Sequence, residues 1–77
     1  MILYPDTEKE LSFDDYKPLP PLRGLSLASL CELSENLQDA EGNAYIYGSE
    51  LFALALDMDI RKIDLYIHFA EKRERNA

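Results

Sequence analysis

The sequence predicts a mostly α-helical fold with three helices, one short strand before the second helix and an extended amino-terminal arm. Apolar residues recur at helical spacing from residue 26 to residue 40, and again on both sides of an acidic break at Asp57 to Asp59. Prolines before residue 25 keep that segment extended, because proline cannot continue a helix. We therefore expect an arm at residues 1–24 and a helical domain at residues 25–77.

The first predicted helix spans Ser26 to Ala40. Its leucines fall three or four residues apart, which places them on one side of a helix. Ser26 can cap the free N–H groups of the first turn, and Gly42 follows as a stop. After it, the segment Asn43 to Gly48 reads NAYIYG, and its β-forming residues between two turn residues predict a short strand.

The remaining two helices are predicted at Ser49 to Leu56 and at Ile60 to Arg73. Ser49 and Asp59 are the candidate caps, and the turn between the helices would contain Asp57. Packed together, the three helices should bury a core of Leu30, Leu33, Leu37, Phe52, Leu56, Ile63, Tyr66 and Ile67.

The stretch from Ser49 to Lys72 resembles the bihelical motif of the helix-turn-helix superfamily, which includes the winged helices. Small and apolar residues stand at the places where the motif has them: Ala53, Leu56, Met58, Ile63, Tyr66 and Ile67. The resemblance implies a helix-turn-helix-like domain whose last helix presents its outer face to a partner, with Asp57 where the family usually has glycine.

The arm carries five large apolar residues among its prolines. They are Leu11, Phe13, Tyr16, Leu19 and Leu22. This is too much apolar surface for a solvated tail, so we expect the arm to be ordered. The sequence leaves open whether the arm packs on the chain's own helices or docks into a partner protein.

Composition favours a protein partner over nucleic acid. The 77 residues carry a formal net charge of −7, with a pI near 4.5, and this sign opposes the neutralisation of phosphates. Cys31 is the one cysteine, so no intramolecular disulfide can form, and no apolar run is long enough for a membrane span or signal peptide. We therefore predict a cytoplasmic protein that does not bind membranes.

Enzyme signatures are absent from the sequence. It has no glycine-rich phosphate loop, no Cys/His metal spacing and no serine or cysteine nucleophile paired with a base. Asp64 and His68 would share one face of the last helix, but such a pair lacks a third ligand and reads as a surface contact. We predict no catalytic residue, no metal site, no cofactor and no enzymatic activity.

The outward face of the last helix is the candidate binding site. For a protein partner, the predicted contacts are Asp59, Ile60, Asp64, Leu65 and His68, with Ile60 and Leu65 as apolar anchors. For a DNA partner, the predicted contacts are Arg61, Lys62 and His68.

These two sets of contacts correspond to two functional hypotheses. In the first, the chain is similar to small acidic proteins of phages and mobile elements that bind and inhibit a host protein. Anti-CRISPR proteins and DNA mimics, which occupy a basic nucleic-acid-binding surface, are examples. In the alternative, the chain is a DNA-binding helix-turn-helix transcriptional regulator or an antitoxin, working as a homodimer.

Overall fold

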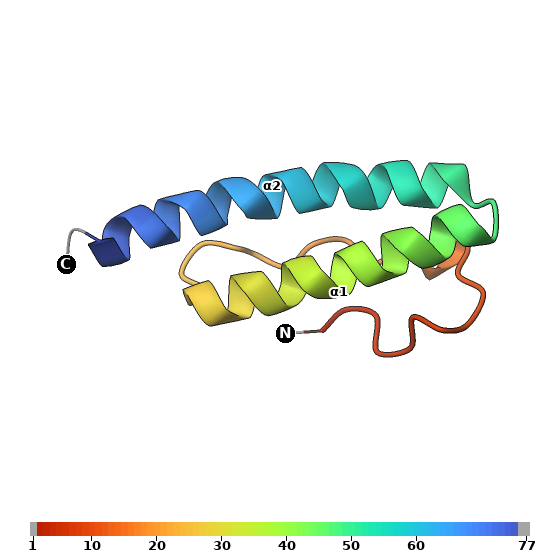
Figure 1. Cartoon of the computed structure of the whole chain (residues 1–77), viewed down its shortest axis with the longest axis horizontal. Helices are drawn as coiled ribbons and strands as arrows, with labels where there is room; N and C mark the ends of the chain where they lie inside the picture. Colours follow the sequence, from red (N-terminus) through yellow and green to blue (C-terminus); the bar gives the residue numbers. More distant parts are fainter. Residues whose placement is uncertain (1, 76–77) are drawn as a thin grey trace.

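Two long antiparallel helices form the body of the protein in a computed structural model that describes residues 2–75. Helix α1 spans Leu27–Ile46 and helix α2 spans Glu50–Arg75. The arm lies along the side of this hairpin and contains a short 3-10 helix, η1, at Phe13–Asp15 (Figure 1). The molecule is elongated, with principal extents of 43 × 19 × 18 Å.

Helix α1 begins where the sequence predicts and ends later. The side chain of Ser26 caps it by accepting a hydrogen bond of 3.1 Å from the N–H of Ser29. The helix then continues through Gly42 to Ile46, so the predicted stop at Gly42 and the predicted strand from Asn43 to Gly48 are wrong.

The physical reason is the seam with α2. Ala40 and Ala44 are both fully buried, and they extend the spacing of the leucines by one more turn. Packing against α2 therefore outweighs the β preference of the tyrosines that follow. The chain reverses at Gly48, whose positive φ of 76° lies in the left-handed region that glycine adopts without strain.

Helix α2 is continuous where the sequence predicts a turn. The predicted helices Ser49 to Leu56 and Ile60 to Arg73 are parts of one helix, and Asp57 and Asp59 lie inside it. No described residue other than glycine has a positive φ. The three-helix, helix-turn-helix-like fold is therefore wrong: residues 2–75 form a two-helix hairpin without a strand.

The sequence of α2 permits a continuous helix, and packing and an ion pair support it. From Ser49 to Arg75 the chain has no glycine and no proline, so nothing in the backbone forces a break. Buried residues continue at helical spacing straight through the acidic segment, from Phe52 and Leu56 to Ile60 and Ile63. Asp57 also forms an ion pair of 3.1 Å with Arg61 one turn later, which supports a helix.

The core lies between the two helices and under the arm. Six of the eight predicted core residues are buried: Leu30, Leu33, Leu37, Phe52, Leu56 and Ile63. Tyr66 and Ile67 are only partly buried at its edge. The arm contributes three further buried side chains, Tyr4, Leu11 and Leu22, so it packs on the chain's own helices.

Two asparagine side chains of α1 hold the arm in place. The Oδ1 atom of Asn36 accepts hydrogen bonds from the N–H groups of Leu3 (2.9 Å) and Tyr4 (2.8 Å), and its Nδ2 atom donates to the Tyr4 carbonyl (2.8 Å). Asn43 lies seven residues later, two turns along the same side of the helix. Each amide acts as both acceptor and donor toward an extended strand-like backbone.

Asn43 is the more buried of the two amides, with 6% of its surface exposed. It accepts from the N–H of Leu11 (3.2 Å) and donates to the carbonyls of Thr7 (2.8 Å) and Lys9 (2.6 Å). These bonds satisfy backbone groups that no sheet or helix satisfies. They also fix the register in which Leu11 enters the core.

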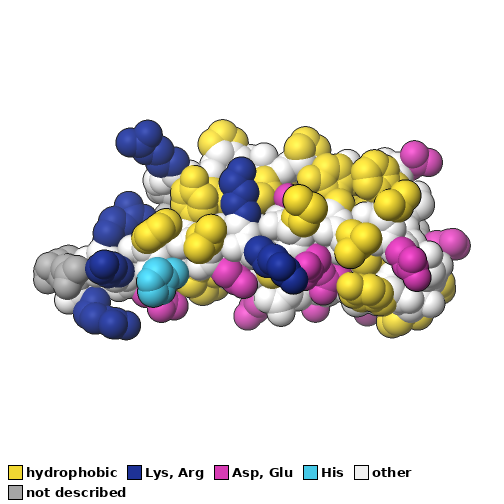
Figure 2. Space-filling model, turned by 90° about the horizontal axis from the view of Figure 1, so that it is seen from above, with side chains coloured by type: hydrophobic (Ala, Val, Ile, Leu, Met, Phe, Trp, Pro, Cys, Tyr) yellow, Lys and Arg dark blue, Asp and Glu magenta, His cyan; other side chains and the backbone are white. Residues whose placement is uncertain are grey.

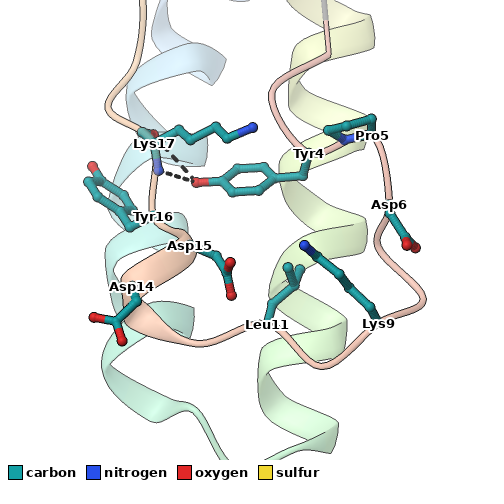
Figure 3. Close-up of a pocket in the computed structure, with 9 residues that line it drawn as sticks. All are labelled: Tyr4, Pro5, Asp6, Lys9, Leu11, Asp14, Asp15, Tyr16 and Lys17. Carbon is teal, nitrogen blue, oxygen red and sulfur yellow. Dashed lines mark hydrogen bonds between the residues drawn. The ribbon is translucent and has the colours of Figure 1, made fainter.

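Tyr4 connects two segments of the arm to each other. Its ring packs edge-on against Phe52 with centroids 5.7 Å apart. Its hydroxyl accepts a hydrogen bond of 2.9 Å from the N–H of Lys17 and donates to the Lys17 carbonyl at 3.4 Å (Figure 3). Two segments of the arm are therefore tied together over the helix pair.

Replacing Ile63 with Ala tests the helical seam. The fully buried side chain leaves a cavity, so unfolding by denaturant should show a loss of about 2–5 kcal/mol. The matched control is Ile46→Ala at the hairpin tip, where the side chain is 79% exposed and the change should stay within about 0.5 kcal/mol. Equal losses at the two positions would contradict the assigned core.

Replacing Asn43 with Ala tests the attachment of the arm. The backbone groups of Thr7, Lys9 and Leu11 lose their partner, so the free energy of unfolding should fall by about 1–3 kcal/mol. The control is Gln38→Ala, which removes from the same helix an amide whose hydrogen bond goes to Ser34 and not to the arm. If hydrogen exchange at Leu11 is as slow in Asn43→Ala as in the parent protein, Asn43 does not anchor the arm.

Candidate protein-binding surface

Five large apolar side chains run along the outside of α2 and are more than half exposed. We call them the outer stripe: Leu51 (72% exposed), Leu54 (57%), Met58 (71%), Leu65 (59%) and Phe69 (56%). Their spacing of three, four, seven and four residues keeps them on one side of a helix. Figure 2 looks onto this face and shows hydrophobic side chains along the length of α2.

The outer stripe lies on the side of α2 that faces away from the core. Leu65 follows buried Ile63 by two residues, which places it about 160° away around the helix. Helix α2 therefore has two apolar sides, and the hairpin uses only one of them.

Helix α1 has no comparable series along its length, because its large exposed apolar residues, Tyr45 and Ile46, both lie at its last turn. Its exposed positions include Glu35, Gln38 and Asp39, and its sequence contains four acidic residues and no Lys or Arg. An ordinary surface helix has one apolar side and one polar side, as α1 does. The second apolar side of α2 therefore distinguishes it from its partner in the hairpin.

Charges border the outer stripe and change sign along it. Asp57 and Arg61 form the exposed ion pair described above. The last turn of α2 carries Lys72, Arg73 and Arg75, and Figure 2 shows Lys and Arg gathered at this end of the molecule. The other end of α2 starts with Glu50.

One of the two predicted apolar anchors is misplaced. Ile60 is 8% exposed and belongs to the core, whereas Leu65 is exposed as predicted. The two residues lie about 140° apart on a continuous helix, so they cannot form one patch. The predicted break at Asp57 to Asp59 would have changed the helical register, and without that break the register set by Phe52 and Leu56 carries Ile60 inward.

The remaining stripe residues were missed as surface residues for the same reason. Leu51, Leu54 and Met58 are apolar at helical spacing, but neither the predicted core nor the predicted binding face includes them. The number of apolar residues in α2 could have predicted this surface, because they are too many for one side of a helix. Residues at 52, 56, 60 and 63 form one series, and residues at 51, 54, 58 and 65 form a second series on the other side.

Asp59 holds the arm, although the sequence predicts it as a contact for a partner. Its Oδ2 atom accepts a hydrogen bond of 2.9 Å from the hydroxyl of Tyr16. Burial, together with the hydrogen bond and negative charge of Asp59, raises the pKa of Tyr16 from 10.0 to about 12. The tyrosine is therefore kept protonated while it bridges the arm to α2.

The other predicted contacts stay on the surface. Asp64, His68, Arg61 and Lys62 are exposed, and the ring of His68 lies 6.1 Å from that of Phe69. Lys62 also borders a shallow hollow beside the proline-rich part of the arm. These side chains border the outer stripe. Their contacts with a protein or with DNA stay predictions.

The described residues contain no cluster of side chains that would make a metal centre. Among residues 2–75, no group of three or more His, Cys, Asp and Glu side chains could hold a metal ion. A hollow of about 270 Å³ lies between two segments of the arm beside Tyr4 and Tyr16, and its lining carries carboxylates and lysines together (Figure 3). No helix within the described range is both long and apolar enough to cross a membrane.

The Tyr16 contact makes stability depend on alkaline pH. Because the pKa is higher in the folded state, this contribution is present below pH 10 and is lost as the pH rises from 10 to about 12. In Tyr16→Phe the phenolate absorbance step near pH 12 should become smaller, and stability should fall less over this range; burial also raises the pKa of Tyr4, which stays in this variant. Tyr45→Phe, at an exposed position, should keep the late step. A late step of the same size in Tyr16→Phe would contradict the assignment.

Comparison with protein-family models, with curated proteins and with solved structures gave no match.

Proposed function

We propose that this protein is a non-enzymatic protein-binding module that docks through the outer stripe of α2. The observation that carries the proposal is the contrast between the two helices. Single exposed apolar residues are normal on a protein surface, but a regular series along one side of a helix has no role within the hairpin. Covering it with another polypeptide removes it from water.

The energetics favour a few anchors within the stripe. Full burial of one leucine or phenylalanine side chain is worth about 1.5–3 kcal/mol, whereas an exposed ion pair contributes about 0–1 kcal/mol. Leu54, Leu65 and Phe69 therefore supply affinity. The charges beside them, including Asp64 and His68, set orientation and association rate.

The net charge of −7 supports a more specific version of the proposal, in which the final target is basic. We propose an inhibitor or regulator of a host protein, such as one with a basic nucleic-acid-binding surface, acting in the cytoplasm and encoded by a phage or mobile element.

The alternative of a DNA-binding regulator loses its geometric basis, because the reading helix of the expected motif is part of α2. It would depend on Arg61, Lys62 and the basic last turn alone. A titration with duplex DNA at several salt concentrations tests it, since phosphate contacts produce a steep loss of affinity with salt.

A photo-reactive amino acid at position 65 tests the proposal in cells that produce the protein. It should cross-link to a polypeptide, and the same group at position 38 on α1 should not. A second change, Leu54→Asp, should reduce the cross-link from position 65 at least tenfold, or about 1.4 kcal/mol in binding. The charge-matched control Gln38→Asp should leave it unchanged.

Circular dichroism must show that each variant is as helical as the parent. A cross-link from position 65 that survives Leu54→Asp in a folded protein would contradict docking through the outer stripe. So would cross-linking from position 38 alone.

A further inference from the structure

We infer that the outer stripe binds a second copy of this chain, so that two hairpins pack antiparallel through α2 into a four-helix dimer. This inference rests on the proposed function and names the partner. It depends on three properties of α2: its nearly neutral charge, the separation of its charges by sign, and a polar gap in the middle of the stripe.

The negative charge of the protein lies away from α2. Helix α1 carries four acidic residues and no basic ones, which gives it a charge of −4. Helix α2 carries six acidic and five basic residues, a net charge of −1. The acidic residues are Glu50, Asp57, Asp59, Asp64, Glu71 and Glu74, and the basic residues are Arg61, Lys62, Lys72, Arg73 and Arg75. Two copies that meet through α2 therefore keep their acidic helices on the outside, where water and salt screen them.

Charge is also separated along α2. The part before Arg61 has three acidic residues and no basic one, a charge of −3. From Arg61 onward, five basic and three acidic residues give +2. An antiparallel pair places the negative part of each helix beside the positive part of the other, and it also opposes the two helix dipoles favourably.

The polar gap sets the register. The outer stripe falls into two groups, one from Leu51 to Met58 and one from Leu65 to Phe69, with Arg61 and Lys62 between them. In a parallel pair these two cations would face their own copies. In an antiparallel pair centred near residue 60, they instead face Met58 and Asp57 of the other copy.

The same register matches the apolar groups. With the two-fold axis near residue 60, Leu54 lies opposite Leu65 of the second copy, and Leu51 lies opposite Phe69 of the second copy. The aliphatic stem of Lys62 can cover Met58 while its ammonium group reaches Asp57. Every member of the outer stripe then has an apolar neighbour.

The size of the contact predicts a reversible dimer. From Leu51 to Phe69 the helix rises about 27 Å, so one helix pair forms a contact at the small end of stable interfaces. Sedimentation equilibrium from low to high micromolar protein should therefore show the mass rising from 8.9 kDa toward twice that value. Leu65→Asp should stay monomeric, and Gln38→Asp should dimerise like the parent.

Disulfide trapping tests the orientation in a Cys31→Ser background. Leu51→Cys and Phe69→Cys should each fail to form a disulfide with its own copy, because the two ends of the stripe are too far apart in an antiparallel pair. A mixture of the two variants should form a disulfide between them. Disulfides formed by each variant alone would overturn the antiparallel arrangement.

The failure of this inference can be distinguished from the failure of the proposed function. A parent protein that stays monomeric at every concentration overturns the dimer, whereas a cross-link from position 65 to a different polypeptide would still support docking through the stripe. If Leu65→Asp is not helical by circular dichroism, Leu54→Asp replaces it. A folded Leu54→Asp protein that dimerises as strongly as the parent also overturns the inference.

Discussion

The packing of α1 against α2 is the interaction on which the rest of the structure depends. Each helix contributes a series of fully buried residues, among them Leu33 and Leu37 from α1 and Phe52 and Ile63 from α2. Two helices alone cover only part of such a seam, because a hairpin has no third layer. The arm supplies that layer with Tyr4, Leu11 and Leu22, so a segment without regular secondary structure becomes part of the core.

An extended segment can serve this purpose only if its backbone polar groups are satisfied. The side chains of Asn36 and Asn43, on one side of α1, form hydrogen bonds with backbone groups of the arm, and the Tyr4 hydroxyl bonds the backbone of Lys17. At two points, the asparagine amides therefore form the hydrogen bonds that a neighbouring strand would form in a sheet. Asp59 on α2 adds a fourth attachment, because its carboxylate accepts a hydrogen bond from the hydroxyl of Tyr16 in the arm.

The outer stripe is a consequence of the same arrangement. Burial against α1 and the arm uses one side of α2, and the other side keeps Leu54, Leu65 and Phe69 exposed. A chain of 77 residues has a small core for its surface, so the proposed association through the second apolar side would add stability. Binding and folding would then be linked, with the free energy of unfolding rising with protein concentration.

The sequence by itself determined the helical class, the Ser26 cap, most of the core residues and the exposure of Leu65. These features depend on the spacing of apolar residues and on capping, which are set by residues close together in the sequence. Tertiary structure decided whether the acidic segment at Asp57 to Asp59 breaks the helix, and thereby which way Ile60 points. Aspartates can cap a helix or lie inside one. Here the aspartates lie inside the helix, because the seam against α1 is continuous and because Asp59 accepts a hydrogen bond from Tyr16, 43 residues away in sequence.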